Sequence, residues 1–118
     1  MRNKTILVIE ADRGLRRAMV QVLSAAGYDV IAGENFGAGL QMVDRLGVDV
    51  MISDVRLSAP SWHRPPRATQ RKPHPPKMLF VTHAPLPGGA SPNPEGDVIA
   101  MPLDGTVLLD KVRSLLAA

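Results

Sequence analysis

The chain has 118 residues and a net charge of +3, and it is 45% hydrophobic but only 3% aromatic. This length and composition predict a single domain over residues 1–118 with an aliphatic core. The absence of cysteine excludes a disulfide framework and a thiolate metal site. No apolar stretch is long enough to span a bilayer and the N-terminus lacks a signal-peptide pattern, so a cytoplasmic protein is expected.

The first half of the chain alternates strand and helix patterns. Apolar periodicity predicts, in chain order, strand 6–9, helix 13–26, strand 28–32, helix 37–46 and strand 48–54. Asp12 is the expected N-cap of the first helix and Gly27 its expected stop. On that helix Arg16, Arg17 and Gln21 are expected to face away from the core. Short connections between such elements imply a parallel sheet with right-handed crossovers.

The second half of the chain is interrupted by proline. Ten of the eleven prolines lie between Pro60 and Pro94, and they disfavour full helices within 57–76 and 85–96. Both segments have loop composition, and their conformation stays open at this point. The remaining pattern predicts two strands and a final helix, over 77–82, 97–101 and 105–117.

Positive charge is concentrated in the proline-rich part of the chain. No acidic residue occurs between Asp54 and Glu95, a stretch that holds six Lys and Arg residues and all three histidines. Such a segment can contact nucleic acid or an acidic protein face, although a solvated loop is the commoner outcome. The basic stretch 56–77 holds one aromatic residue, Trp62, and the histidines lack metal-ligand spacing. Nucleic-acid or metal binding is therefore not expected there.

Carboxylates follow two of the predicted strands. Asp54 closes the third predicted strand, and Glu10 and Asp12 follow the first. In an open α/β sheet the functional groups gather outside the carboxyl ends of the strands. Two strands that deliver acids to one edge indicate a site for a cation or a phosphoryl group. Alternatively, Asp54 only starts a turn or caps a helix, as Asp often does.

With these features the chain resembles the receiver domain of two-component response regulators. The resemblance is carried by Ile6-Leu7-Val8-Ile9-Glu10, Leu15-Arg16-Arg17, Ala26-Gly27-Tyr28-Asp29-Val30, Asp49-Val50-Met51-Ile52-Ser53-Asp54, Phe80-Val81-Thr82 and Pro102-Leu103. It implies a flavodoxin-like α/β fold with a five-stranded parallel sheet in the order 2-1-3-4-5. The prolines predict that helices 3 and 4 of that fold are eroded or replaced by Pro-rich loops.

The resemblance also implies a phosphorylation site. Asp54 matches the aspartate that accepts the phosphoryl group, and Thr82 matches the hydroxyl residue that hydrogen-bonds the phosphoryl oxygen. Glu10 matches the first member of the acidic pair that helps to hold a divalent cation. A carboxylate that attacks phosphorus needs such a cation, usually Mg²⁺, to offset charge on the transferring oxygens.

Several positions depart from the family pattern. Ala11 stands at the second acidic position, which is expected to ligate the metal directly, and Asp12 comes one residue too late. Met101 stands where the family has a lysine that pairs with the phosphoryl group, and Met offers neither a charge nor a donor. We therefore expect Glu10 and Asp54 to bind Mg²⁺ weakly or not at all, and we expect no other cofactor.

The sequence thus predicts a stand-alone degenerate receiver that acts in phosphorelay signalling through protein–protein contacts, with impaired Mg²⁺-dependent phosphorylation. Two alternatives stay open: a functional single-domain response regulator phosphorylated on Asp54, and a module that binds anions or nucleic acid. Expected partners are a histidine kinase, a phosphotransfer protein or another regulator; a second copy of the chain is a further candidate, and no membrane contact is expected. An enzyme is not expected, because no nucleophile–base pair, Gly-rich phosphate loop or cofactor motif occurs.

Overall fold

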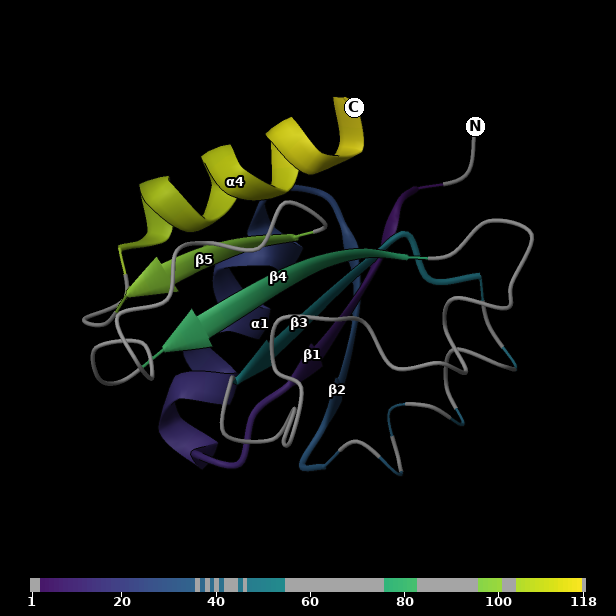
Figure 1. Ribbon diagram of the computed structural model, residues 1–118, viewed down its shortest axis with the longest axis vertical. Coiled ribbons are helices and arrows are strands. Elements are labelled where there is room, and N and C mark those ends of the chain that lie inside the picture. Colours follow the sequence, from purple (N-terminus) through teal and green to yellow (C-terminus); the bar gives the residue numbers. More distant parts are fainter. Residues whose placement is uncertain are drawn as a thin grey trace.

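The computed structural model describes residues 3–35, 37, 39, 41, 45, 47–54, 76–82, 96–100 and 104–117. The strands and helices, in chain order, are β1 (Thr5–Ile9), α1 (Arg13–Ala25), β2 (Asp29–Gly33), β3 (Val50–Asp54), β4 (Lys77–Thr82), β5 (Gly96–Ala100) and α4 (Gly105–Ala117) (Figure 1). Within the predicted helix 37–46, the described residues 37, 39, 41 and 45 are helical.

The strands form one sheet in which every neighbouring pair is parallel. Their order is β2-β1-β3-β4-β5, so β1 lies between the two strands that follow it in the chain. This is a flavodoxin-like order, and the predicted α/β class with a parallel sheet is confirmed. Because all strands run in one direction, all of their carboxyl ends lie at the same edge of the sheet.

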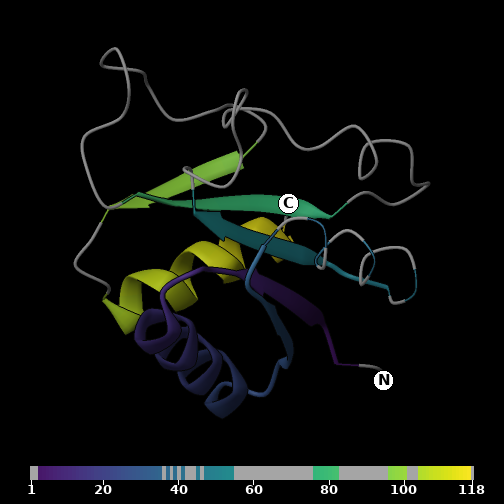
Figure 2. The ribbon, with the colours of Figure 1, turned by 90° about the horizontal axis from the view of Figure 1, so that it is seen from below.

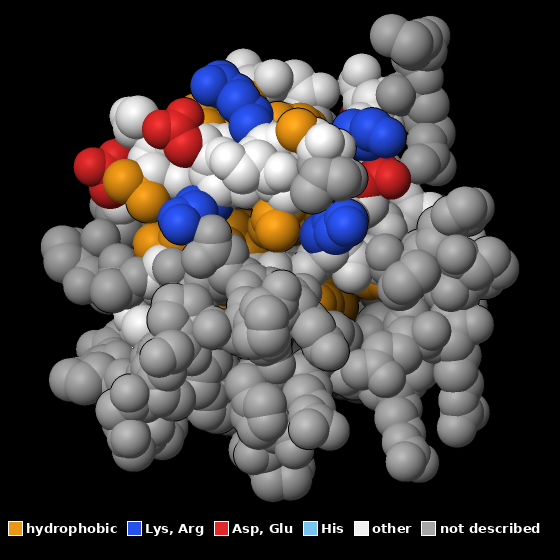
Figure 3. Space-filling view, turned by 45° about the horizontal axis from the view of Figure 1, so that its top comes forward, with side chains coloured by type: hydrophobic (Ala, Val, Ile, Leu, Met, Phe, Trp, Pro, Cys, Tyr) orange, Lys and Arg blue, Asp and Glu red, His pale blue; other side chains and the backbone are white. Residues whose placement is uncertain are grey.

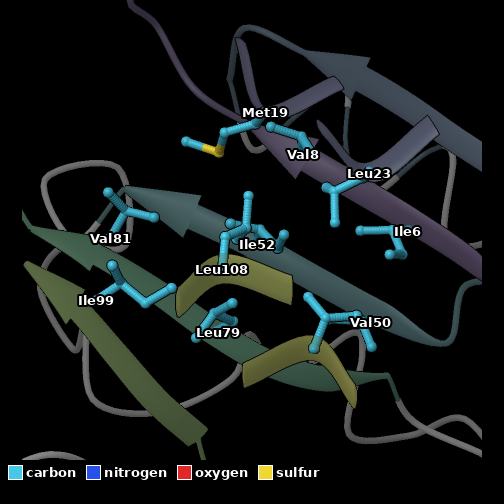
Figure 4. Close-up of a cluster of buried hydrophobic side chains, with 11 residues drawn as sticks. Ile6, Val8, Met19, Leu23, Val50, Ile52, Leu79, Val81, Ile99 and Leu108 are labelled. Carbon is cyan, nitrogen blue, oxygen red and sulfur yellow. The ribbon is translucent and has the colours of Figure 1, made fainter. Parts of the chain in front are cut away.

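Helices α1 and α4 lie on the same face of the sheet (Figure 2). Successive side chains of a strand point to opposite faces, so every second strand residue points toward these two helices. The core on this face is formed by Ile6, Val8, Met19, Leu23, Val50, Ile52, Leu79, Val81, Ile99, Leu108 and Val112 (Figure 4). Every one of these side chains is aliphatic, as the composition predicts, and none is more than 4% exposed.

The opposite face of the sheet buries a second apolar set. It consists of Leu7, Ile9, Val48, Met51, Met78 and Phe80. Gly39, which is buried, lies directly against this set: a Cβ built on Gly39 would overlap Cδ1 of Ile9 and lie 3.0 Å from its Cγ1. The chain after β2 therefore approaches β1 so closely that a side chain at position 39 has no room.

Local capping chemistry sets the ends of α1. Asp12 has an extended backbone, and its Oδ1 accepts a hydrogen bond of 2.9 Å from the backbone N–H of Leu15. At the other end Gly27 has a φ of 97°, a left-handed conformation that favours glycine. Asp12 is thus confirmed as the N-cap and Gly27 as the stop. The helix itself ends at Ala25, one residue before the predicted end, whereas α4 has its predicted bounds.

On the face shown in Figure 3, the described residues carry acidic and basic side chains that are intermixed. Among the described residues Val107 is the one large hydrophobic side chain that is exposed, at 40%. Of the described helices, neither α1 nor α4 is long and apolar enough to cross a membrane. Nearly all of 57–76 and 85–96, where the prolines predict eroded helices, lies outside the described residues, as do Trp62 and the three histidines.

Candidate functional site

The two carboxylates that the sequence places at strand ends become neighbours in the sheet. Asp54 is the last residue of β3, and Glu10 follows the last residue of β1 directly. Ile9 is in register with Ser53, so Glu10 and Asp54 occupy the next paired position along these two strands. Adjacent strands lie about 4.8 Å apart, so this register brings the two carboxyl groups close together.

Thr82 occupies the same edge of the sheet, on the far side of β3. It is the last residue of β4, and it lies one step beyond Val81, the residue in register with Asp54. All three polar residues are buried, with exposed fractions of 0% for Glu10, 1% for Asp54 and 5% for Thr82. The carboxyl edge of the sheet therefore holds a small, buried polar site.

Electrostatics limits what this site can hold. Two carboxylates on adjacent strands repel each other when both are ionised, and burial strengthens the repulsion because little water screens it. A cation or a bound proton is the simple way to offset such a pair. The arrangement of Glu10 beside Asp54 is therefore suited to a cation, and its affinity depends on how many further ligands lie nearby.

The connection between β1 and α1, residues 10–12, supplies no further carboxylate to the pair. Ala11 is exposed and has only a methyl group. Asp12 uses its Oδ1 to accept the N–H of Leu15 as the N-cap of α1, and its own N–H donates to Oε1 of Glu10 at 3.3 Å. Its backbone thus contributes to the acidic site, while its carboxylate serves the helix terminus.

The residues present fit Mg²⁺ in chemical type, because carboxylate oxygens are the ligands that this ion takes. They are few in number: among the described residues no group of three or more His, Asp or Glu side chains could hold a metal ion. Glu10 and Asp54 are the two that would contact a cation at this edge of the sheet.

One residue at this edge was missed by sequence reasoning. Arg16 was expected to face away from the core, but that expectation is wrong. Its side chain is only 16% exposed, and its Nη1 donates a hydrogen bond of 2.8 Å to the backbone carbonyl of Glu10. A helical wheel cannot anticipate this placement, because a long arginine side chain can fold back over the first turn of its own helix.

Other residues that the family pattern brings to the site fall outside the part of the chain that the structure describes. Met101, at the position where the family has a lysine, and Pro102 after it lie outside the described residues. The basic residues from Arg56 to Lys72 also lie outside them. The described site therefore consists of Glu10, Asp54 and Thr82, together with the 10–12 connection and Arg16.

Comparisons with known proteins found similarity in sequence and in fold. No family model matches the chain. Over 94% of its length it is 25% identical to the transcriptional regulatory protein GlrR of Escherichia coli, and over 91% it is 27% identical to the response regulator protein FleR of Pseudomonas aeruginosa. Among solved structures, a CheY-like response regulator receiver domain from Methanospirillum hungatei superimposes with a TM-score of 0.81 at 23% identity, covering 98% of this chain and 95% of that one.

The chain has the fold of a response regulator receiver domain. The resemblance stated from its sequence motifs is confirmed by these relatives and by the structural match. This receiver-fold chain spans about a quarter of the length of the curated relatives it matches, 26% for GlrR and 23% for FleR. The match therefore concerns about a quarter of each of those regulators and not their remaining length.

Proposed function

We propose that this receiver-fold chain is a degenerate receiver of two-component phosphorelay signalling, with impaired Mg²⁺-dependent phosphorylation. The observation that carries the proposal lies between β1 and α1, where Ala11 stands at the second acidic position and the Asp12 carboxylate caps the helix. Under this proposal the domain acts by binding other proteins and not as an enzyme.

The chemical reason for impaired phosphorylation is that too little positive charge is held around Asp54, the phosphoacceptor position. Phosphoryl transfer to a carboxylate needs cations that stabilise the transferring oxygens. Glu10 and Asp54 offer fewer ligands for a divalent ion than the family pattern does, and Met101 replaces the lysine that would pair with the phosphoryl group. The departures at Ala11 and Met101 both slow phosphoryl transfer to Asp54, and neither prevents a folded domain from binding a partner.

The alternative is a functional response regulator receiver that is phosphorylated on Asp54. A specific observation favours it: Asp54, Glu10 and Thr82 are all retained and are all buried at one edge of the sheet. Mg²⁺ is commonly bound through only one or two carboxylates, with water and phosphate as its other ligands. The alternative therefore needs a direct measurement of phosphorylation.

The proposed partners are a histidine kinase, a phosphotransfer protein or another regulator, with a second copy of the chain as a further candidate. Helix α1 exposes Arg13 and Arg17, two positive charges that favour an acidic partner face. Arg16, which the sequence placed beside them, is instead folded onto the 10–12 connection and contributes little to that surface. Binding through Arg13 and Arg17 should weaken as salt rises.

The decisive experiment is intact-mass spectrometry after incubation with acetyl phosphate and Mg²⁺. The wild-type chain should gain little or no phosphoryl mass. The variant Ala11→Asp should gain more, and the double variant Ala11→Asp/Met101→Lys more still, because these changes restore a metal ligand and a cation.

Asp54→Asn in each background is the matched control, since it keeps the size of the side chain and removes the nucleophile. Stoichiometric phosphorylation of the wild-type chain that disappears with Asp54→Asn would overturn the proposal and establish the alternative. Phosphorylation that survives Asp54→Asn would show that the mass gain has another origin.

A further inference from the structure

The 10–12 connection beside the acidic pair is tied to α1 by a closed set of hydrogen bonds. The backbone N–H of Arg16 donates to the carbonyl of Asp12 at 2.9 Å, and the N–H of Asp12 donates to Oε1 of Glu10 at 3.3 Å. The Arg16 guanidinium then donates to the carbonyl of Glu10 at 2.8 Å. Arg16, Asp12 and Glu10 therefore form a ring in which the Glu10 carboxylate is one member.

The guanidinium has further contacts that hold it in place. Its Nη1 also lies 3.5 Å from the carbonyl of Ala11, and its Nη2 lies 3.8 Å from Oε1 of Glu34, just after β2. Glu34 is 76% exposed, so this long ion pair adds little. The carbonyl contacts carry the arrangement: both are made by Nη1, and the bond to the carbonyl of Glu10 is the shorter one.

We propose that Arg16 is a positioning residue, which holds the 10–12 connection and through it the Glu10 carboxylate beside Asp54. This inference deepens the proposed function, because it accounts for an acidic site that has few metal ligands and still keeps a defined shape. The positive charge of Arg16 also lies next to main-chain oxygens at the end of β1, where it offsets part of the local negative potential.

The inference is tested by NMR on the full chain in EDTA, so that no metal contributes. Arg16→Gln should move the ¹³C signal of the Glu10 carboxyl and the amide signal of Asp12. Amide exchange at Asp12 should become about tenfold faster, which is the loss expected for one hydrogen bond to a charged group. Exchange at Leu7, in the middle of β1, should follow only the change in global stability.

Arg16→Lys is the conservative variant and keeps the positive charge. It should restore the Asp12 amide signal in part, since an ammonium also donates to carbonyl oxygens but ends a differently shaped side chain without the fixed planar geometry of the guanidinium. Arg17→Gln, an exposed arginine on the same helix, and Glu34→Gln, which removes the long ion pair, are the matched controls and should leave both signals in place.

The inference is overturned if Arg16→Gln moves the Glu10 and Asp12 signals no more than Arg17→Gln does. It is also overturned if Leu7 and Asp12 exchange faster by the same factor, because the residue would then only stabilise the whole fold. Neither outcome depends on Mg²⁺ or on phosphorylation, so this test fails or succeeds independently of the mass measurement above.

Discussion

The carboxylate of Asp49 accepts a hydrogen bond of 2.8 Å from the backbone N–H of Thr5, a residue 44 positions earlier in the chain. The backbone N–H of Asp49 returns a bond of 2.9 Å to the carbonyl of Thr5, and its carbonyl accepts from Lys77 at 3.0 Å. Asp49 thus joins the starts of β1, β3 and β4. Asp49, which precedes β3, and Asp54, its last residue, therefore have separate roles, since Asp49 secures the edge of the sheet opposite to Asp54.

Asp49→Ala should lower the free energy of unfolding by about 1.5–3 kcal/mol, because the N–H of Thr5 loses a charged acceptor in a partly buried position. Asp49→Asn should cost less, since it keeps an acceptor oxygen. Urea unfolding measures both. Asp29→Ala, an exposed aspartate of β2, is the control, and an equal loss for Asp29→Ala and Asp49→Ala would contradict the structural role of the bond.

The contact between Gly39 and Ile9 gives a second prediction. Gly39→Ala should lower stability, since overpacking costs about 1–3 kcal/mol and the better helix propensity of Ala returns only about 1 kcal/mol. Ile9→Val removes the Cδ1 that the new methyl group would overlap, so the double variant should be more stable than the sum of the two single changes implies. Gly37→Ala, at an exposed position, should show no such coupling.

The role of Asp12 as a cap separates it from the acidic pair. Asp12→Ala should lower stability by about 0.5–2 kcal/mol, whereas Asp12→Ser should retain most of it because serine is also a good N-cap. Neither change should alter the response of the chain to Mg²⁺. Thermal unfolding of each variant with and without millimolar Mg²⁺ provides the measurement, and a Mg²⁺ response lost with Asp12→Ser would place its carboxylate in the metal site.

Adding a carboxylate at position 11 should have opposite effects with and without metal. In EDTA, Ala11→Asp should lower stability by on the order of 1 kcal/mol, because a third negative charge joins Glu10 and Asp54. Millimolar Mg²⁺ should reverse the loss, since a ligand that binds only the folded state raises its stability. Ala11→Asn is the uncharged control, and the wild-type chain should respond little. A wild-type response as large as that of Ala11→Asp would mean that two carboxylates suffice.

Local patterns were enough to predict much of this protein. Asp12 before the apolar spacing of α1, and Gly27 after it, predicted both ends of that helix to within one residue. These signals work because capping and helical periodicity depend on neighbours within a few positions of the chain. The same holds for Asp54 at the end of an apolar run, whose place at a strand end could be predicted without knowledge of any other strand.

What the sequence determined by itself, then, was which residues form strands and helices and which polar residues stand at their ends, because these depend on short-range periodicity and capping. Only the tertiary structure decided that Glu10 and Asp54 follow in register on adjacent strands, that Gly39 meets Ile9, and that Arg16 bonds the carbonyl of Glu10. The first two depend on strand register and helix docking, which are set by packing across the whole sheet. The third depends on a flexible side chain whose partners exist only once β1 and α1 have come together.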